Sequence, residues 1–286
     1  MFAVMGATGR TGSAVARRLL AAGERVRVIG RSAERLSELA GAEPAVGDAG
    51  DPAFLAEAFQ GVAAAYVMFP YDPRTEDFLA EQRRLGAAVE QARPARVVLL
   101  SSIGADLPAG TGFVTSLHEH EQRLAGVPDL LVLRPGSFYE NFAEALRMVP
   151  DFGVIADAVD AEVPVPMVST RDVAAAAADA LLDRGWHGHV VRELRGPRDL
   201  SYAEATALLG ARIGRPDLPY VRLPDDELIG ALRGAGFSAT TAALHVELGR
   251  AISDGTITAS GEPGSAPTPF EVVADELARE FLAVPR

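Results

Sequence analysis

The sequence predicts an α/β protein with a doubly wound parallel sheet and a smaller C-terminal α/β lobe. Short apolar segments alternate with helical patterns along the first half of the chain. These segments are apolar throughout rather than at every second residue, which is typical of strands covered on both faces. Beyond Pro150 the alternation becomes less regular. We therefore expect a Rossmann-type domain over residues 1–150 and a lobe over 151–286, part of which returns to the main sheet.

The first element is a strand, a glycine turn and a helix. Residues 1–5 are apolar, and the helical pattern follows three glycines. Gly6 can turn sharply out of the strand, Gly9 lets the backbone approach a pyrophosphate, and Gly12 lets the helix lie close to the strand. The N–H groups of the first helical turn would face the ligand's negative charge. The unit predicts a bound dinucleotide, against the alternative of a purely structural turn. The cofactor-binding candidates here are Gly6, Thr8, Gly9, Arg10, Thr11 and Gly12.

Further strands and helices follow in alternation. The strands are expected at residues 25–29, 45–46, 63–68, 96–100, 130–133 and 189–194. Asp51 is a good N-cap for the helix before Gly61. Capping-box spacing at Ser116–Glu119 and Ser201–Glu204 predicts two more helix starts. Thr170 or Asp172 is expected to cap an alanine-rich helix that follows.

Composition excludes several classes of function. The net charge of −12 argues against nucleic acid and against an anionic membrane surface as partners. The chain has no cysteine, so disulfides and thiolate chemistry are absent. The first strand begins at Met1, which leaves no room for a signal peptide, and no apolar run approaches the length of a membrane span. A cytoplasmic location is the expectation.

Two basic residues after the second strand predict the type of dinucleotide. An acidic residue normally holds the ribose hydroxyls of NAD at this place, but here Gly30 and Arg31 stand there, with Arg35 one turn later. A guanidinium can bond two oxygens of a ribose 2′-phosphate. We therefore favour NADP(H) over NAD(H); the alternative is that both arginines are surface charges. Asp48 could accept from the adenine amino group or cap its own turn.

Several motifs together resemble one family, the NmrA-like branch of the atypical short-chain dehydrogenases/reductases. That branch includes NADP(H)-binding regulators and NAD(P)H:quinone reductases. The resemblance covers nearly the whole chain and implies a Rossmann fold that binds NADP(H). It is carried by Gly6-Ala-Thr-Gly-x-x-Gly12, Gly30-Arg-Ser32, Gly47-Asp48, Ser101-Ser-Ile-Gly104, Leu133-Arg-Pro-Gly-x-Phe-x-Glu-Asn141, Pro166-Met-Val-Ser-Thr-Arg-Asp172 and Pro269-Phe-Glu271.

The usual catalytic pair of short-chain dehydrogenases is absent. The family resemblance implies a serine after the fifth strand, here Ser101 with Ser102 beside it, followed by a Tyr-x-x-x-Lys pair that supplies the proton. The family's spacing puts Val114 at the tyrosine position and His118 at the lysine position. The chain contains no lysine at all. His118 could bond the nicotinamide ribose and transfer a proton, or it could be a half-solvated helix residue.

Aromatic residues supply the remaining candidates. Phe69 follows the fourth strand and should line the cofactor channel, and Tyr71 could cover the nicotinamide or be a loop aromatic. The resemblance places Tyr139 on the substrate side. The catalytic candidates are thus His118, Tyr71 and Tyr139. No metal site is expected, because the histidine pairs have no carboxylate or third histidine at ligand spacing.

Two functions of different class are compatible with these residues. The first is an NADPH-dependent reductase of a small conjugated acceptor such as a quinone or an enone. The alternative is a non-catalytic NADP(H) redox sensor that signals to a partner protein. A deep apolar pocket at the nicotinamide end would favour the enzyme, and an exposed apolar patch would favour the sensor.

Overall fold

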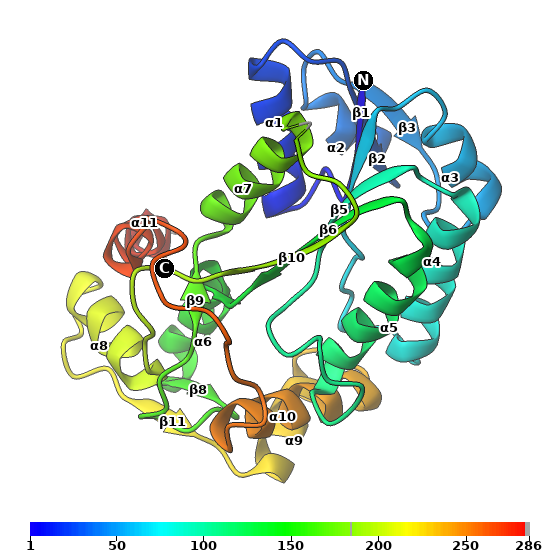
Figure 1. The fold of residues 1–286 in the computed structure, drawn as a ribbon. Coiled ribbons are helices and arrows are strands. Elements are labelled where there is room, and N and C mark those ends of the chain that lie inside the picture. Colours follow the sequence, from blue (N-terminus) through cyan, green and yellow to red (C-terminus); the bar gives the residue numbers. More distant parts are fainter. Residues whose placement is uncertain (184, 284–286) are drawn as a thin grey trace.

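A seven-stranded parallel sheet forms the centre of the molecule, which confirms the predicted fold class (Figure 1). The computed structural model describes residues 1–183 and 185–283. The strand order is β10-β6-β5-β4-β1-β2-β3, so the chain reverses direction across the sheet between β1 and β4. In such sheets, ligands bind at this reversal, outside the carboxyl ends of the strands. The strands are β1 (Phe2–Met5), β2 (Val26–Gly30), β3 (Glu43–Val46), β4 (Ala64–Val67), β5 (Arg96–Leu100), β6 (Asp129–Pro135) and β10 (His189–Leu194).

Helices cover both faces of this sheet, as the apolar strands require. Alternate residues of β1 belong to different cores: Val4 packs on one face and Met5 on the other, and both are almost fully buried. The first face carries α1 (Arg10–Ala21), α2 (Ala33–Ser37) and α7 (Thr170–Leu182). The opposite face carries α3 (Pro52–Ala58), α4 (Phe78–Ala92) and α5 (Thr115–Arg123).

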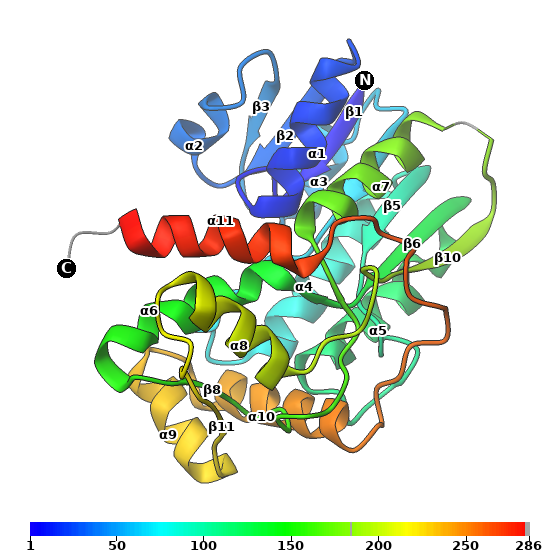
Figure 2. The ribbon, with the colours of Figure 1, turned by 90° about the vertical axis from the view of Figure 1, so that its left-hand side faces the viewer.

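The C-terminal lobe has its own core, and it is not one continuous segment. Residues 170–194 leave the lobe and add α7 and β10 to the main sheet. Figure 2 shows α11 lying between the main sheet and the lobe helices. Two short parallel pairs, β8–β11 and β7–β9, complete the lobe. Its elements are β7 (Ser137–Phe138), α6 (Phe142–Phe152), β8 (Ile155–Asp157), β9 (Met167–Val168), α8 (Tyr202–Arg212), β11 (Tyr220–Arg222), α9 (Asp225–Gly234), α10 (Ala239–Ser253) and α11 (Phe270–Ala283).

Two of the predicted helix starts are confirmed and two are wrong. Asp51 and Ser201 accept hydrogen bonds from the first turns of α3 and α8, as N-caps should. Ser116 lies inside α5 instead, and its hydroxyl donates to the carbonyl of Phe113 at 2.7 Å, because the short helix η1 (Gly112–Val114) leads directly into α5. The cap of α7 is Ser169, one residue before Thr170, the nearer of the two predicted caps.

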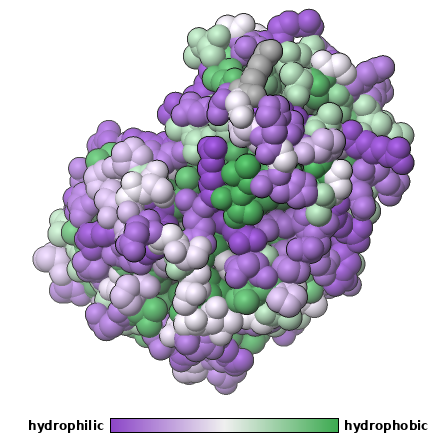
Figure 3. Space-filling view, in the orientation of Figure 1, coloured by the Kyte–Doolittle hydropathy of each residue, from purple (hydrophilic) through white to green (hydrophobic). Residues whose placement is uncertain are grey.

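The face of the molecule seen in Figure 3 is largely polar. Figure 3 shows one face, on which small apolar patches are separated by hydrophilic residues. No helix within the described ranges is long and apolar enough to cross a membrane. The same residues contain no cluster of histidine and carboxylate side chains that could hold a metal ion.

Candidate functional site

The glycine turn forms an uncapped helix start at the carboxyl end of β1. Gly6 has a φ of +65°, and a Cβ there would lie 2.1 Å from the sulfur of Met68. A Cβ on Gly12 would lie 2.3 Å from the carbonyl oxygen of Gly6, so this glycine packs the helix against the turn. Gly9 is exposed, and no side chain caps the N–H groups that follow it. This arrangement fits an anionic pyrophosphate.

The residues around this helix start differ in their access to solvent. Arg10 is exposed at the first position of α1, whereas the side chain of Thr11 is buried. Thr8 is half-buried, and its carbonyl oxygen accepts from Nη2 of Arg35 at 2.7 Å. Arg35 therefore holds the glycine turn as well as contributing positive charge beside it.

Arg31 follows β2 directly and is exposed. It makes no hydrogen bond or ion pair with any of the described residues, but its charge helps to lower the pKa of Asp48 and Asp72, so it lies near both. Its five N–H donors remain available to a ligand. Both arginines were predicted to contact the cofactor, and the structure separates them: among the described residues, Arg35 has a hydrogen-bond partner and Arg31 has none.

Asp48 has a structural role that the sequence left open. Its two carboxylate oxygens accept from Arg84 at 3.0 and 3.2 Å, and the N–H of Gly50 donates to it at 2.9 Å. The hydrogen bonds from Arg84 and then from Gly50 lower the pKa of Asp48. The turn-capping alternative is therefore realised. A contact with adenine remains a prediction, since a carboxylate can accept further hydrogen bonds.

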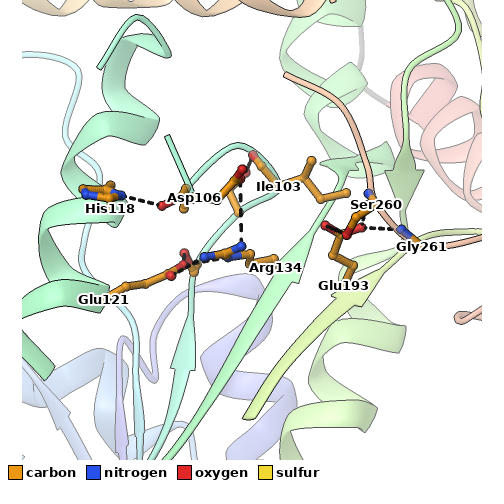
Figure 4. A network of polar contacts seen from close by, with 11 residues as sticks. Ile103, Asp106, His118, Glu121, Arg134, Glu193, Ser260 and Gly261 are labelled. Atoms are coloured by element: carbon orange, nitrogen blue, oxygen red, sulfur yellow. Dashed lines mark hydrogen bonds and ion pairs between the residues drawn. The ribbon is translucent and has the colours of Figure 1, made fainter. Parts of the chain in front are cut away.

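A buried polar network lies at the carboxyl ends of β5 and β6 (Figure 4). Ser101 donates to the carboxylate of Glu121 at 2.5 Å, and Arg134 pairs with the same carboxylate through two bonds of 3.0 and 2.6 Å. Asp106 lies 3.8 Å from the other side of Arg134. Sequence reasoning missed Glu121, because a buried carboxylate is recognisable only from its partner. Ser101 is thus held by the protein, and Ser102 donates to the carbonyl of Ile103.

His118 faces this network from α5 and has one nitrogen without a protein partner. Its Nδ1 lies 2.9 Å from the carbonyl oxygen of Ala105. A carbonyl oxygen can only accept, so Nδ1 carries the hydrogen. Nε2 makes no hydrogen bond with the described part of the chain and is therefore available to a ligand. Val114, at the tyrosine position of the family pattern, is buried.

Phe69 is part of the core beneath the site. Its ring stacks on His120 with centroids 3.5 Å apart, and it is only 8% exposed. Gln82 connects His120 to the backbone of Pro70: its amide oxygen accepts from Nε2 of His120 at 3.1 Å, and its amide nitrogen donates to the carbonyl of Pro70 at 2.9 Å. Burial lowers the pKa of His120 to about 3, with Arg123 adding to the effect. Because the ring of Phe69 is buried against His120, any contact of Phe69 with a cofactor would come from its backbone.

Tyr71 lies at the surface between the sheet and the lobe. It is 45% exposed, and its ring contacts Phe78 and Phe113 with centroids 5.5 and 5.3 Å apart. Burial of the hydroxyl, helped by Asp72, raises the pKa of Tyr71 to about 12. The hydroxyl therefore keeps its proton at neutral pH. Because 45% of the residue is exposed, Tyr71 is also accessible to a ligand.

Tyr139 does not lie where the sequence placed it. The residue is 1% exposed and packs edge-on against Phe270 in the core of the lobe. A Cβ on Gly196 would lie 2.1 Å from its hydroxyl, which shows how closely the chain surrounds it. In this structure the ring cannot reach an acceptor, so we replace the interpretation of Tyr139 as a catalytic candidate with that of a core residue.

A strap of residues 254–269 crosses the far side of the same region. Glu193 of β10 accepts from Ser260 and from the N–H of Gly261 (Figure 4). Ile257 of the strap lies over Gly104, where a Cβ would be 2.9 Å from its Cγ1. The strap thus covers the loop after β5.

Comparison with known proteins defines the class of this one. A family model described as NAD(P)H-binding matches residues 6–126. The chain is 36% identical over 220 residues to a (4-alkanoyl-5-oxo-2,5-dihydrofuran-3-yl)methyl phosphate reductase of Streptomyces griseus, covering 76% of this chain and 75% of that protein. It is 31% identical over 255 residues to an NAD(P)H azoreductase of Xenophilus azovorans, covering 87% and 86%.

Together with the site, these relatives identify an NAD(P)H-dependent oxidoreductase. The fold agrees with that of an NADPH-dependent quinone oxidoreductase of Escherichia coli solved with NADPH, with a TM-score of 0.81, 24% identity, and coverage of 97% of this chain and 99% of that one. The chain belongs to the NmrA-like family of atypical short-chain dehydrogenases/reductases.

Proposed function

We propose that this protein reduces a flat conjugated acceptor, of which a quinone is the model, at the expense of NADPH. The acceptor binds at the carboxyl ends of β4, β5 and β6, between the nucleotide domain and the lobe. The single observation that carries the proposal is the replacement of the catalytic pair: Val114 and His118 stand at the tyrosine and lysine positions, and the chain has no lysine.

The preference for NADPH is supported by the charges beside the glycine turn. Arg31 and Arg35 stand where NAD-binding proteins carry an acid, and Arg31 has its donors unused by the described residues. The uncapped first turn of α1 would hold the pyrophosphate, and Nε2 of His118 would bond the nicotinamide ribose. When bound, NADPH supplies a hydride at C4 of its nicotinamide.

The nature of the acceptor is supported by what the site lacks. Hydride arrival at an isolated carbonyl creates a strongly basic alkoxide, which needs a positioned acid worth about 10²–10⁴ in rate. Hydride arrival at a quinone creates a stabilised phenolate, which needs only a weak acid. The proteins that this chain resembles include a quinone oxidoreductase and an azoreductase, and quinones and azo compounds are both conjugated.

The proposal is tested by following NADPH consumption with a matched pair of acceptors, menadione and an unconjugated cyclic ketone. We expect turnover with menadione, and we expect the rate with the ketone to be lower by a factor of about 10² or more. Ketone reduction as fast as menadione reduction would refute the proposal. Tight NADPH binding without turnover of any acceptor would favour the sensor instead.

A further inference from the structure

A histidine and an aspartate from distant parts of the lobe form a half-buried pair. Nε2 of His245, on α10, lies 3.1 Å from Oδ1 of Asp157, the last residue of β8. Both side chains are 26% exposed. The carboxylate also accepts from the N–H of Ala158. A carboxylate only accepts, so Nε2 keeps its hydrogen, and Nδ1 is the nitrogen that gains and loses a proton. Nδ1 has no hydrogen-bond partner among the residues described.

The helix that carries His245 packs against the segment that leads to His118. Figures 1 and 2 show α10 next to α5 and to the β8–β11 pair. α10 packs on η1 so closely that a Cβ on Gly112 would lie 2.1 Å from the carbonyl oxygen of Leu244. η1 leads into α5, which carries His118. The helix therefore fixes His245 relative to the ribose-side residue of the site.

Asp157 and His245 have different surroundings. Asp157 lines a cavity of about 40 Å³, together with residues that follow β6, among them Ser137 and Asn141. The ring of His245 lies 6.4 Å from that of Phe113, which in turn contacts the exposed Tyr71. These aromatic faces suit a flat acceptor.

Electrostatics favour a charged ring. Burial lowers the pKa of His245, but the hydrogen bond and the negative charge of Asp157 outweigh burial and raise it overall. Tyr202 and Tyr220 also face Asp157, and burial raises both of their pKa values, so both stay neutral. Arg222 stands opposite Asp157 in the β8–β11 pair, and its guanidinium pairs with Asp160. Tyr220 donates to the carbonyl of Val159. The imidazolium form is thus more favoured than in a free histidine.

We propose that His245 is the weak acid that protonates the conjugated acceptor after hydride transfer, and that Asp157 positions its ring. The inference rests on the proposed function. The hydride and its electron pair leave C4 of NADPH and form a bond with the acceptor. The displaced π pair moves to the acceptor's oxygen or nitrogen, which takes the proton from Nδ1 of His245. NADP⁺, the reduced acceptor and neutral His245 remain, and solvent restores the proton.

The first test measures the histidine without any turnover. NMR titration of the apoprotein should give His245 a pKa above the ordinary value of about 6.5, and Asp157→Asn should lower it. A pKa of His245 that does not change in Asp157→Asn would overturn the positioning role.

The second test compares kcat for menadione and for an enone in wild type and His245→Gln. Glutamine keeps an N–H group for Asp157 and removes the titrating nitrogen. We expect kcat to fall about 10²-fold for the enone, whose enolate is the stronger base, and less for menadione. Wild-type kcat should fall as pH rises through the pKa of His245, and the variant should lose this dependence. His187→Gln is the control: this exposed histidine lies 3.4 Å from Asp129 at the opposite end of β6.

The outcomes separate the two proposals. Equal losses for both acceptors, with the pH dependence retained, would make the pair a structural clasp and overturn the inference alone. Unchanged kcat in His245→Gln would also overturn the inference and leave the proposed function standing. A wild-type protein that binds NADPH and reduces neither acceptor would overturn the inference together with the proposed function.

Discussion

Arg31→Ala should lower the affinity for NADPH and leave the affinity for NADH unchanged. The reason is that the guanidinium would contact only the 2′-phosphate, which NADH lacks. Hydrogen bonds to charged groups contribute about 1.5–3 kcal/mol, which corresponds to a loss of roughly tenfold to a hundredfold. Because Arg31 is exposed, and salt screens exposed charges, we expect the lower end of this range at physiological ionic strength.

Arg35→Ala should behave differently. Nη2 of Arg35 donates to the carbonyl of Thr8 in the glycine turn at 2.7 Å. Losing this bond loosens the turn that would hold the pyrophosphate, which both cofactors share. Arg35→Ala should therefore weaken NADPH and NADH together, with an additional loss for NADPH.

Calorimetric titration of each variant with both cofactors measures these effects. Arg25→Ala is the matched control, because Arg25 precedes β2 whereas Arg31 follows it, and its side chain is 78% exposed. Equal affinities of the wild type for NADPH and NADH would refute the assignment. So would an Arg31→Ala variant that weakens both cofactors to the same extent.

Three further predictions concern the site and its support. Gly9→Val should abolish cofactor binding, because the side chain would occupy the space that the pyrophosphate needs. The protein should stay folded, since an added Cβ meets only the carbonyl of Gly6, at 3.3 Å; a variant that loses both binding and thermal stability would contradict this. Below pH 6.5 the unfolded chain protonates His120, whereas the folded protein keeps it neutral down to about pH 3. The contribution of His120 to the unfolding free energy should therefore drop by about 1.4 kcal/mol per pH unit; a urea-melt series in which His120→Gln keeps the wild-type slope would argue against it. Glu121→Gln should cost about 3 kcal/mol in urea melts, because it removes the carboxylate that makes both close bonds to Arg134 and leaves Asp106, at 3.8 Å, as the nearer negative charge; a loss below 1 kcal/mol would count against the network.

The succession of strands and helices and the cofactor turn could be predicted because their causes are local. Gly6 must adopt a positive φ, and a strand buried on both faces must be apolar throughout. The residues in and next to β1 therefore suffice to predict this unit. The cap of α7 was misplaced by one residue, because Ser169, Thr170 and Asp172 are all good N-caps and local preference cannot separate them. Asp172 instead binds Thr268, far along the chain.

The side chains of the site were harder to predict, since their roles depend on partners distant in sequence. Glu121 is stabilised in a buried position by Arg134, and Asp157 meets a histidine 88 residues later. Tyr139 was interpreted as a wall of the site because it follows β6, but the lobe closes around it and α11 covers it. These outcomes follow from packing between segments, which a single sequence does not reveal.

Hydride transfer from NADPH to a conjugated acceptor is tested most directly by a single-turnover experiment. The enzyme is loaded with NADPH carrying deuterium at the transferable C4 position, mixed with excess menadione, and followed by the loss of NADPH absorbance. We predict rapid oxidation that is measurably slower with the deuterated cofactor than with the ordinary one. Bound NADPH that menadione leaves unoxidised, or oxidation at the same rate for both cofactors with chemistry shown to limit the rate, would contradict hydride transfer.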